Sequence, residues 1–159
     1  MRLIHSDTDP ASKRTSPLPA TITQILDSTL GSADFGENST LEMARRCGFG
    51  EITLEHIGLA VHEIMVNAIV HGNRSDIQKK VVLTISRTER ELRIIITDQG
   101  DGFDPDRLPD PLSPEALLAG SGRGMYLART FMDEFHVQRG CTRGATVTMV
   151  KHVRPLDHP

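Results

Sequence analysis

The segment "HEIMVNAIVHG" (residues 62–72) says most about the fold of this 159-residue chain. Most of its residues are apolar, as in a buried helix, but Glu63, Asn67 and His71 interrupt the pattern at four-residue intervals. Residues four apart lie on one face of a helix. Burying such polar groups without partners costs about 2 kcal/mol or more each. The stripe is therefore either satisfied by protein neighbours or faces something that is not protein.

The surrounding pattern predicts a long helix that begins at Thr53, as N-cap, and runs to about His71. Gly72 and Asn73 then form a C-cap pair. One apolar face of this helix is predicted to face the core, and it consists of Ile57, Val61, Ile64, Met65 and Ala68.

The remaining elements follow from β-branched runs and glycine breaks. A first strand is expected at 21–30, and a helix from Asn38 to Cys47 that stops at Gly48. The segments expected downstream are a β-hairpin at 81–88 and 91–98, a helix at 125–135, and strands at 135–140 and 145–153. Strands and helices are segregated along the chain, which favours an α+β fold. We expect a two-layer sandwich whose mixed, mostly antiparallel sheet is covered by helices on one face.

The composition is that of an ordinary globular domain, with 38% hydrophobic and 25% charged residues. We expect a flexible arm at 1–20, the domain at 21–152 and a tail at 153–159. A net charge of −3 and few aromatic residues argue against direct nucleic-acid binding. The N-terminus has no apolar signal region, and no apolar run is long enough to cross a membrane. The two distant cysteines predict reduced thiols in a cytoplasmic protein.

Two glycine-rich segments follow the long helix. "DQGDGF" (98–103) places Asp98 at the end of an apolar strand, before Gly100 and Gly102. "GSGRGM" (120–125) leads into a helix, where free backbone N–H groups can hold phosphate. It is neither a Walker A nor a Rossmann motif. By themselves these segments also fit a tight turn and a flexible hinge. Likewise, Glu63 and Asn67 alone fit a solvated stripe, and a zinc-protease motif is excluded because residue 66 is Val.

In this order, however, the motifs resemble the Bergerat ATP-binding fold of the GHKL superfamily (gyrase, histidine kinase and MutL-type ATPases). Within it, the chain is most similar to the anti-sigma-factor serine/threonine kinases of RsbW type. The similarity covers about residues 22–151. It is strongest in "HEIMVNAIVHGN" (62–73), "ITDQGDGF" (96–103) and "GSGRGMYLARTFMDEFHV" (120–137).

The resemblance implies a role for each motif residue. Asn67 matches the Mg²⁺ ligand, and Glu63 the base that acts on the attacking hydroxyl. Asp98 matches the residue that reads the adenine amino group, assisted by Thr146. Gly100 and Gly102 would let the backbone lie against the base. His71 would contact phosphate or the lid, or only the helix end. The phosphate-wrapping segment would consist of Gly120, Ser121, Gly122, Arg123, Gly124 and Met125, with 104–119 as the lid.

The resemblance also implies ATP or ADP and Mg²⁺ as ligands, and a sigma factor and a STAS-type anti-sigma-factor antagonist as partners. A homodimer is expected, with no membrane partner. Two alternatives stay open: a non-catalytic, nucleotide-dependent module that sequesters a regulatory partner, and a histidine-kinase catalytic domain. Glu63 favours a kinase, because a pure binder needs no base there. Ala145 departs from the Ser or Thr of many relatives, and the lid is unusually rich in proline.

Overall fold

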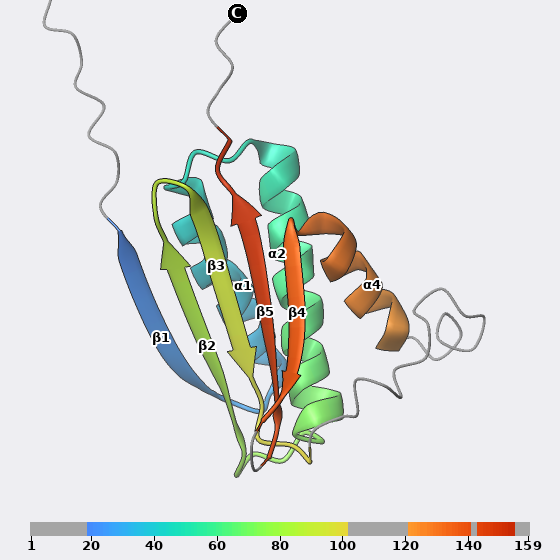
Figure 1. Ribbon diagram of the computed structural model, residues 1–159. Helices are drawn as coiled ribbons and strands as arrows, with labels where there is room; N and C mark the ends of the chain where they lie inside the picture. Colours follow the sequence, from blue (N-terminus) through green and yellow to red (C-terminus); the bar gives the residue numbers. More distant parts are fainter. Residues whose placement is uncertain (1–18, 102–120, 141–142, 155–159) are drawn as a thin grey trace, which may run out of the picture.

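The computed structural model describes residues 19–101, 121–140 and 143–154 (Figure 1). Several predicted features lie outside these ranges. They are most of the arm at 1–20, Gly102, the lid at 104–119, Gly120, Cys141 and the tail from residue 155.

The described strands form one five-stranded sheet in the order β1-β2-β3-β5-β4. Their bounds are β1 Ala20–Asp27, β2 Lys80–Arg87, β3 Glu91–Thr97, β4 Glu134–Arg139 and β5 Ala145–His152. All four pairings between these strands are antiparallel. The α+β class is confirmed, and no parallel pair occurs among the described strands.

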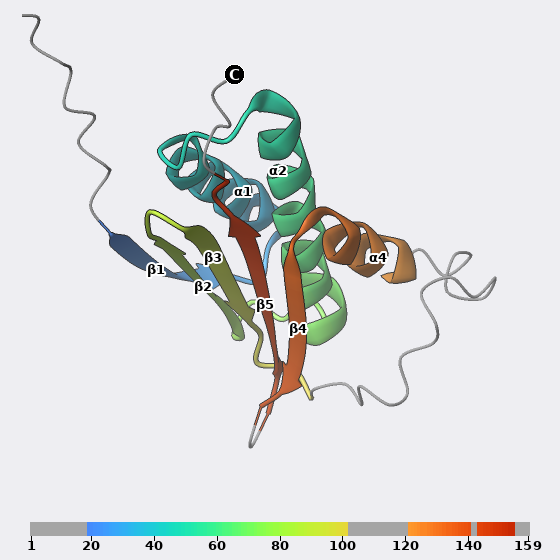
Figure 2. The ribbon, with the colours of Figure 1, turned by 45° about the horizontal axis from the view of Figure 1, so that its top comes forward.

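The helices lie against one face of the sheet, and the other face is open among the described residues (Figure 2). They are α1 Leu30–Arg45, α2 Glu51–Val66, the π-helix η1 Asn67–Gly72, and α4 Ser121–Phe131. The predicted apolar face of the long helix is confirmed, because all five of its residues are buried. They pack with alternate residues of β2 and β3, from Val81 to Ile96, to form the core. None of the described helices combines the length and apolar character that crossing a membrane requires.

The helix predicted at Asn38–Cys47 is longer than expected, because α1 begins at Leu30. Gly36, which was interpreted as the break before this helix, lies inside it. Gly36 is buried, and a Cβ at this position would come within 3.1 Å of Leu83 and 3.3 Å of Met65. The residue is glycine because the helix packs closely on the sheet. The predicted stop is confirmed, since Gly48 follows the helix at φ +81°.

The predicted N-cap at Thr53 is wrong, because α2 begins at Glu51 and its N-cap is Gly50. The helix predicted at 125–135 is also displaced: α4 begins at Ser121, within the glycine-rich segment, and ends at Phe131. The chain then enters β4, which pairs with β5. Glycine lowers helix propensity but does not forbid a helix whose apolar side packs on a neighbour. Here Ala128 and Met132 join the core.

Candidate nucleotide site

Asp98 lies where β3 ends, at the end of the sheet that also holds η1 and the start of β5 (Figure 1). Leu92, Ile94 and Ile96 point into the core, and strand alternation places Asp98 on the same, helix-covered side. Asp98 as a whole is only 9% exposed. The sheet therefore carries an acidic group inward at a position where the preceding inward residues are apolar.

The two oxygens of Asp98 have different environments. Oδ1 accepts hydrogen bonds from the backbone N–H groups of Gly100, at 2.9 Å, and Ala145, at 3.2 Å. No hydrogen bond from another described residue reaches Oδ2. One oxygen is thus fixed by the backbone, and the other is left as an acceptor for a ligand.

Burial raises the pKa of the Asp98 carboxyl above its usual value. Hydrogen bonds from Gly100 and Ala145 and the charge of Lys79 act in the opposite direction but do not outweigh it. The ionised form is therefore held in an environment that disfavours it. A hydrogen-bond donor from a ligand would stabilise that form.

Three glycines lie close to Asp98, and an added Cβ at each would collide with Asp98 or with Gly72. A Cβ at Gly72 would lie 2.7 Å from Oδ2 of Asp98, and one at Gly100 would lie 2.1 Å from the carbonyl oxygen of Gly72. Gly144, at φ +78°, packs against the backbone oxygen of Asp98. Gly100 was predicted from sequence. Gly72 was interpreted as part of a helix C-cap, and Gly144 was not among the predicted site residues.

Asn73 is a further residue of this region that sequence reasoning missed, since it was interpreted as part of a C-cap pair. Its side chain is fully buried and makes three hydrogen bonds. Nδ2 donates to Oγ of Ser28, at 2.8 Å, and to the Lys80 carbonyl, at 3.0 Å; Oδ1 accepts from the Gln99 N–H, at 2.8 Å. The amide thus ties the end of η1 to β1, β2 and the residue after Asp98. The signal available in the sequence was an amide side chain at the junction between the long helix and the following strands.

Glu63 and Asn67 are half-buried near the end of α2. No hydrogen bond or ion pair connects either side chain to another described residue. Glu63 lies against the first turns of α4, where a Cβ at Gly124 would come within 2.3 Å of its carboxylate. Gly124 is therefore needed for the close approach of α4 to α2. The absence of protein partners among the described residues fits the interpretation that this stripe faces a ligand.

The helix changes its winding at Asn67. Residues 67–72 form the π-helix η1, in which the N–H of Asn73 bonds to the carbonyl of Ala68. Single π turns inside helices are frequent at functional sites. The prediction for His71 assumed the four-residue spacing of an α-helix, which the wider π turn changes. The His71 side chain is exposed. Its contact with phosphate or the lid stays a prediction.

The predicted role of Thr146 is not supported by its position. Its register partner is Thr97, and the two hydroxyls are 3.0 Å apart. Both side chains lie on the open face of the sheet, because Ala145 and Val147 occupy the helix-covered face. Thr146 therefore points away from Asp98, and Ala145 stands beside it. Ala145 contributes its backbone N–H to Oδ1 and its carbonyl to the N–H of Asp98.

The glycine-rich segment contributes the start of α4, which begins at Ser121. Gly122 and Met125 are half-buried, Gly124 is buried, and the Arg123 side chain is exposed. These residues lie beside α2, against which α4 packs. Their contact with phosphate stays a prediction, as do the roles of Gly102 and Gly120.

The arrangement can bind a flat ligand that donates a hydrogen bond to a carboxylate at the end of β3. The glycines at 72, 100 and 144 keep backbone close to that carboxylate. The adjoining helix carries Glu63 and Asn67, two polar side chains with no partner in the described part of the chain. Adenine fits the first feature through its amino group, and a Mg²⁺-bound phosphate chain fits the second, because amide oxygens are suitable Mg²⁺ ligands.

Comparison with known proteins defines the class. The model of the histidine kinase-like ATPase domain matches residues 38–151, and the chain belongs to this family. Within it, the chain is similar to serine-protein kinases named RsbW. It is 33% identical to that of Bacillus subtilis, over 73% of this chain and 76% of the relative. It is 36% identical to that of Bacillus licheniformis, over 69% and 71%.

A solved structure supports the fold. The crystal structure of the RsbU and RsbW domains of a Mycobacterium tuberculosis protein superposes with a TM-score of 0.60 at 20% identity. The match covers 86% of this chain but only 33% of that longer one. The two proteins share the arrangement of sheet and helices.

Proposed function

We propose that this protein is an ATP-dependent protein serine/threonine kinase and anti-sigma factor. In this proposal it phosphorylates a STAS-type anti-sigma-factor antagonist, and it sequesters a sigma factor when the antagonist is not bound. The observation that carries the proposal is the buried Asp98 carboxylate, whose Oδ2 has no partner among the described residues, next to a helix where Glu63 and Asn67 also lack such partners. The similarity to RsbW serine-protein kinases supports the same function.

Asp98 would select the base. Its Oδ2 can accept a hydrogen bond from the amino group of adenine, whereas guanine presents a carbonyl at that position. The backbone at Gly72 and Gly100 packs closely beside this carboxylate, because an added Cβ at either glycine would collide with Asp98 or with Gly72. ATP is therefore expected to be favoured over GTP.

Glu63 and Asn67 would serve the transfer step. Bound Mg·ATP supplies the phosphoryl group and the charge neutralisation on which phosphoryl transfer chiefly depends. Asn67 would hold the metal through its amide oxygen. Glu63 would orient the acceptor hydroxyl and take its proton as the oxygen bonds to the γ-phosphorus and ADP departs. Ser121, Gly122, Arg123, Gly124 and Met125 would hold the phosphates from the start of α4.

The test is transfer of label from γ-labelled ATP to purified STAS-domain proteins of the same organism. Wild type is expected to label one of them on serine or threonine. Glu63→Gln should bind ATP normally but transfer phosphate about 100-fold more slowly or worse, which is the usual range for general-base catalysis. ATP binding without transfer to any STAS protein would contradict the kinase and leave a nucleotide-dependent binding module. Light scattering would test the expected homodimer.

A further inference from the structure

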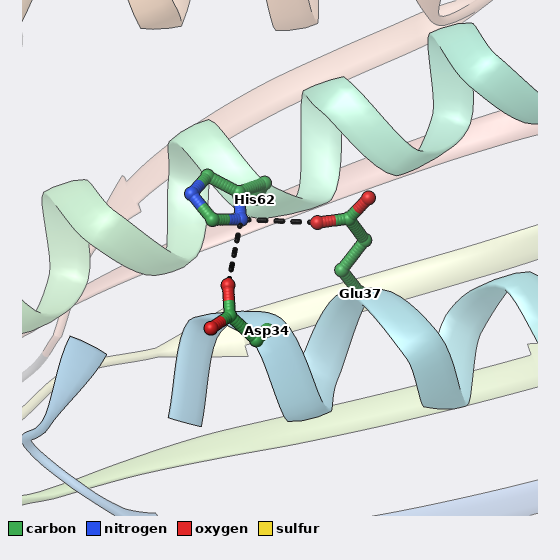
Figure 3. A group of neighbouring side chains, drawn as sticks. All are labelled: Asp34, Glu37 and His62. Carbon is green, nitrogen blue, oxygen red and sulfur yellow. Dashed lines mark hydrogen bonds and ion pairs between the residues drawn. The ribbon is translucent and has the colours of Figure 1, made fainter. Parts of the chain in front are cut away.

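A second group of polar side chains converges outside the nucleotide site, between α1 and α2 (Figure 3). Asp34 and Glu37 lie one turn apart on α1, and His62 faces them from α2. Nδ1 of His62 is 3.0 Å from Oε2 of Glu37 and 3.7 Å from Oδ1 of Asp34. One donor atom from each residue lies within 4.8 Å of the others.

These separations are close to those around a bound transition-metal ion. With metal–ligand bonds of about 2.1 Å, donor atoms in tetrahedral or octahedral sites lie about 3.0–3.5 Å apart. Two of the three atoms already meet this spacing, and the third needs only a rotation of the Asp34 side chain. That side chain is 71% exposed and free to make such a movement.

The charge of the cluster also favours a cation. Two carboxylates converge on one imidazole, and no lysine or arginine among the described residues forms an ion pair with either of them. Two carboxylates this close together repel each other, and a nearby cation reduces that repulsion. A divalent ion at their meeting point would balance both carboxylates and use the neutral form of the ring.

The Glu37 carboxylate is held in place by the helix it faces. A Cβ at Gly58 would lie 3.1 Å from Oε1 of Glu37, so that this oxygen rests against α2 one turn before His62. The other oxygen, Oε2, is the one directed at Nδ1. The Glu37 and His62 side chains are about one-third exposed, which leaves a path for an ion.

We propose that Asp34, Glu37 and His62 bind a divalent transition-metal ion of the Zn²⁺ class. One imidazole nitrogen with two carboxylate oxygens suits borderline ions such as Zn²⁺ or Co²⁺. Mg²⁺ and Ca²⁺ prefer all-oxygen sites, and soft Cu⁺ prefers sulfur. The bound ion would join α1 to α2 at the residue preceding Glu63. This site is separate from the proposed nucleotide site and does not depend on it.

The test is titration of untagged, nucleotide-free protein with Zn²⁺ by calorimetry, in the presence of excess Mg²⁺. We expect one ion per chain, and at least about tenfold weaker binding in His62→Ala and in Glu37→Gln, because each loses a ligand. Glu42→Gln, on the same helix, and His136→Ala, on the open sheet face, are matched controls that should bind as wild type does.

Co²⁺ absorption separates this site from cysteine binding, because a site without sulfur shows no strong thiolate charge-transfer band. The proposal is overturned if wild type binds no stoichiometric Zn²⁺, or if His62→Ala and Glu37→Gln bind it unchanged. A thiolate band in the Co²⁺ spectrum that accounts for all binding would also overturn it. Loss of thermal stability in His62→Ala, without any metal effect in wild type, would show that the cluster is only a hydrogen-bonded clamp between helices.

Discussion

Two aspartates at the ends of secondary-structure elements have opposite environments. Asp133, between α4 and β4, uses both oxygens: Oδ2 accepts from the His152 N–H, at 2.7 Å, and Oδ1 from Nζ of Lys151, at 3.2 Å. Asp98 uses Oδ1 twice, and its Oδ2 has no hydrogen-bond partner among the residues that the structure describes. Both oxygens of Asp133 are thus satisfied by the protein, as in a structural hydrogen-bonding group. Asp98 keeps one oxygen available to a ligand.

Their pKa values differ in direction. Burial raises the pKa of Asp98, and the backbone hydrogen bonds do not outweigh it. Burial also acts to raise the pKa of Asp133, but hydrogen bonds from His152 and Lys151 and their charges together lower it. Asp133 therefore stabilises the fold above its unfolded pKa, and this contribution is lost as the pH falls through the folded pKa. Ionised Asp98 does the opposite: the fold loses stability as the pH rises through its folded pKa.

The largest loss of stability is expected at Gly100, whose backbone N–H donates to Asp98. In Gly100→Ala the new Cβ would lie 2.1 Å from the Gly72 carbonyl oxygen, so the backbone must move. We expect a loss of about 3 kcal/mol in the free energy of unfolding, at the upper end for overpacking, and weaker nucleotide binding. Urea denaturation measures the loss. Gly31→Ala is the control, because nothing lies within 4 Å of its Cβ.

Asn73→Ala should cost about 2 kcal/mol, since one buried and two part-buried hydrogen bonds of about 1 kcal/mol each are lost and the site partly relaxes. Because Asn73 anchors the residues on both sides of Asp98, nucleotide affinity should fall as well. Asn38→Ala, exposed on α1, is the matched control. Unchanged stability in Asn73→Ala would show that this amide does not organise the site.

Asp133→Asn should cost about 1 kcal/mol, because the charge-assisted hydrogen bond with Lys151 is lost. Its affinity for ATP should equal that of wild type. The difference in stability between wild type and variant should vanish as the pH falls through the folded pKa of Asp133. Denaturation at several pH values measures this difference. A loss of ATP binding in the variant would contradict the assignment of a purely structural role to Asp133.

The smallest effect is the pH dependence of nucleotide binding. Ionised Asp98 is the form that accepts a hydrogen bond from the base, and its pKa is raised. Affinity should therefore weaken as the pH falls from neutral, beginning at a higher pH than an ordinary aspartate would produce. Calorimetry between neutral and mildly acidic pH measures it. Constant affinity down to the pKa of a free aspartate would contradict the burial argument.

Much of the fold could be predicted because the apolar periodicity of the core elements is strong. The hairpin, the last two strands and the buried face of α2 all follow from it. The first turns of α1 could not be predicted, because Gly36 was interpreted as a break before the helix. Gly36 is explained by its approach to Leu83 and Met65, which are remote in sequence.

The site could be predicted only where a local motif marks it. Asp98 and Gly100 follow a strand within such a motif and were proposed from it, whereas Gly72 and Asn73 contact other elements that are distant in sequence. Thr146 was misplaced because its side depends on the register with Thr97, which sequence alone does not give. Strand alternation assigns the position beside Asp98 to Ala145 instead.

The most direct test of the central claim is calorimetry of Mg·ATP binding to wild type and Asp98→Asn, with thermal denaturation of both. We predict micromolar binding by wild type, about −8 kcal/mol, and at least about 100-fold weaker binding by the variant. The variant should unfold at the same temperature or higher, because asparagine keeps an acceptor for Gly100 and Ala145 and removes a buried charge. Binding of ATP by Asp98→Asn with wild-type affinity, or no binding by wild type, would contradict the assignment of Asp98 as the adenine-reading residue.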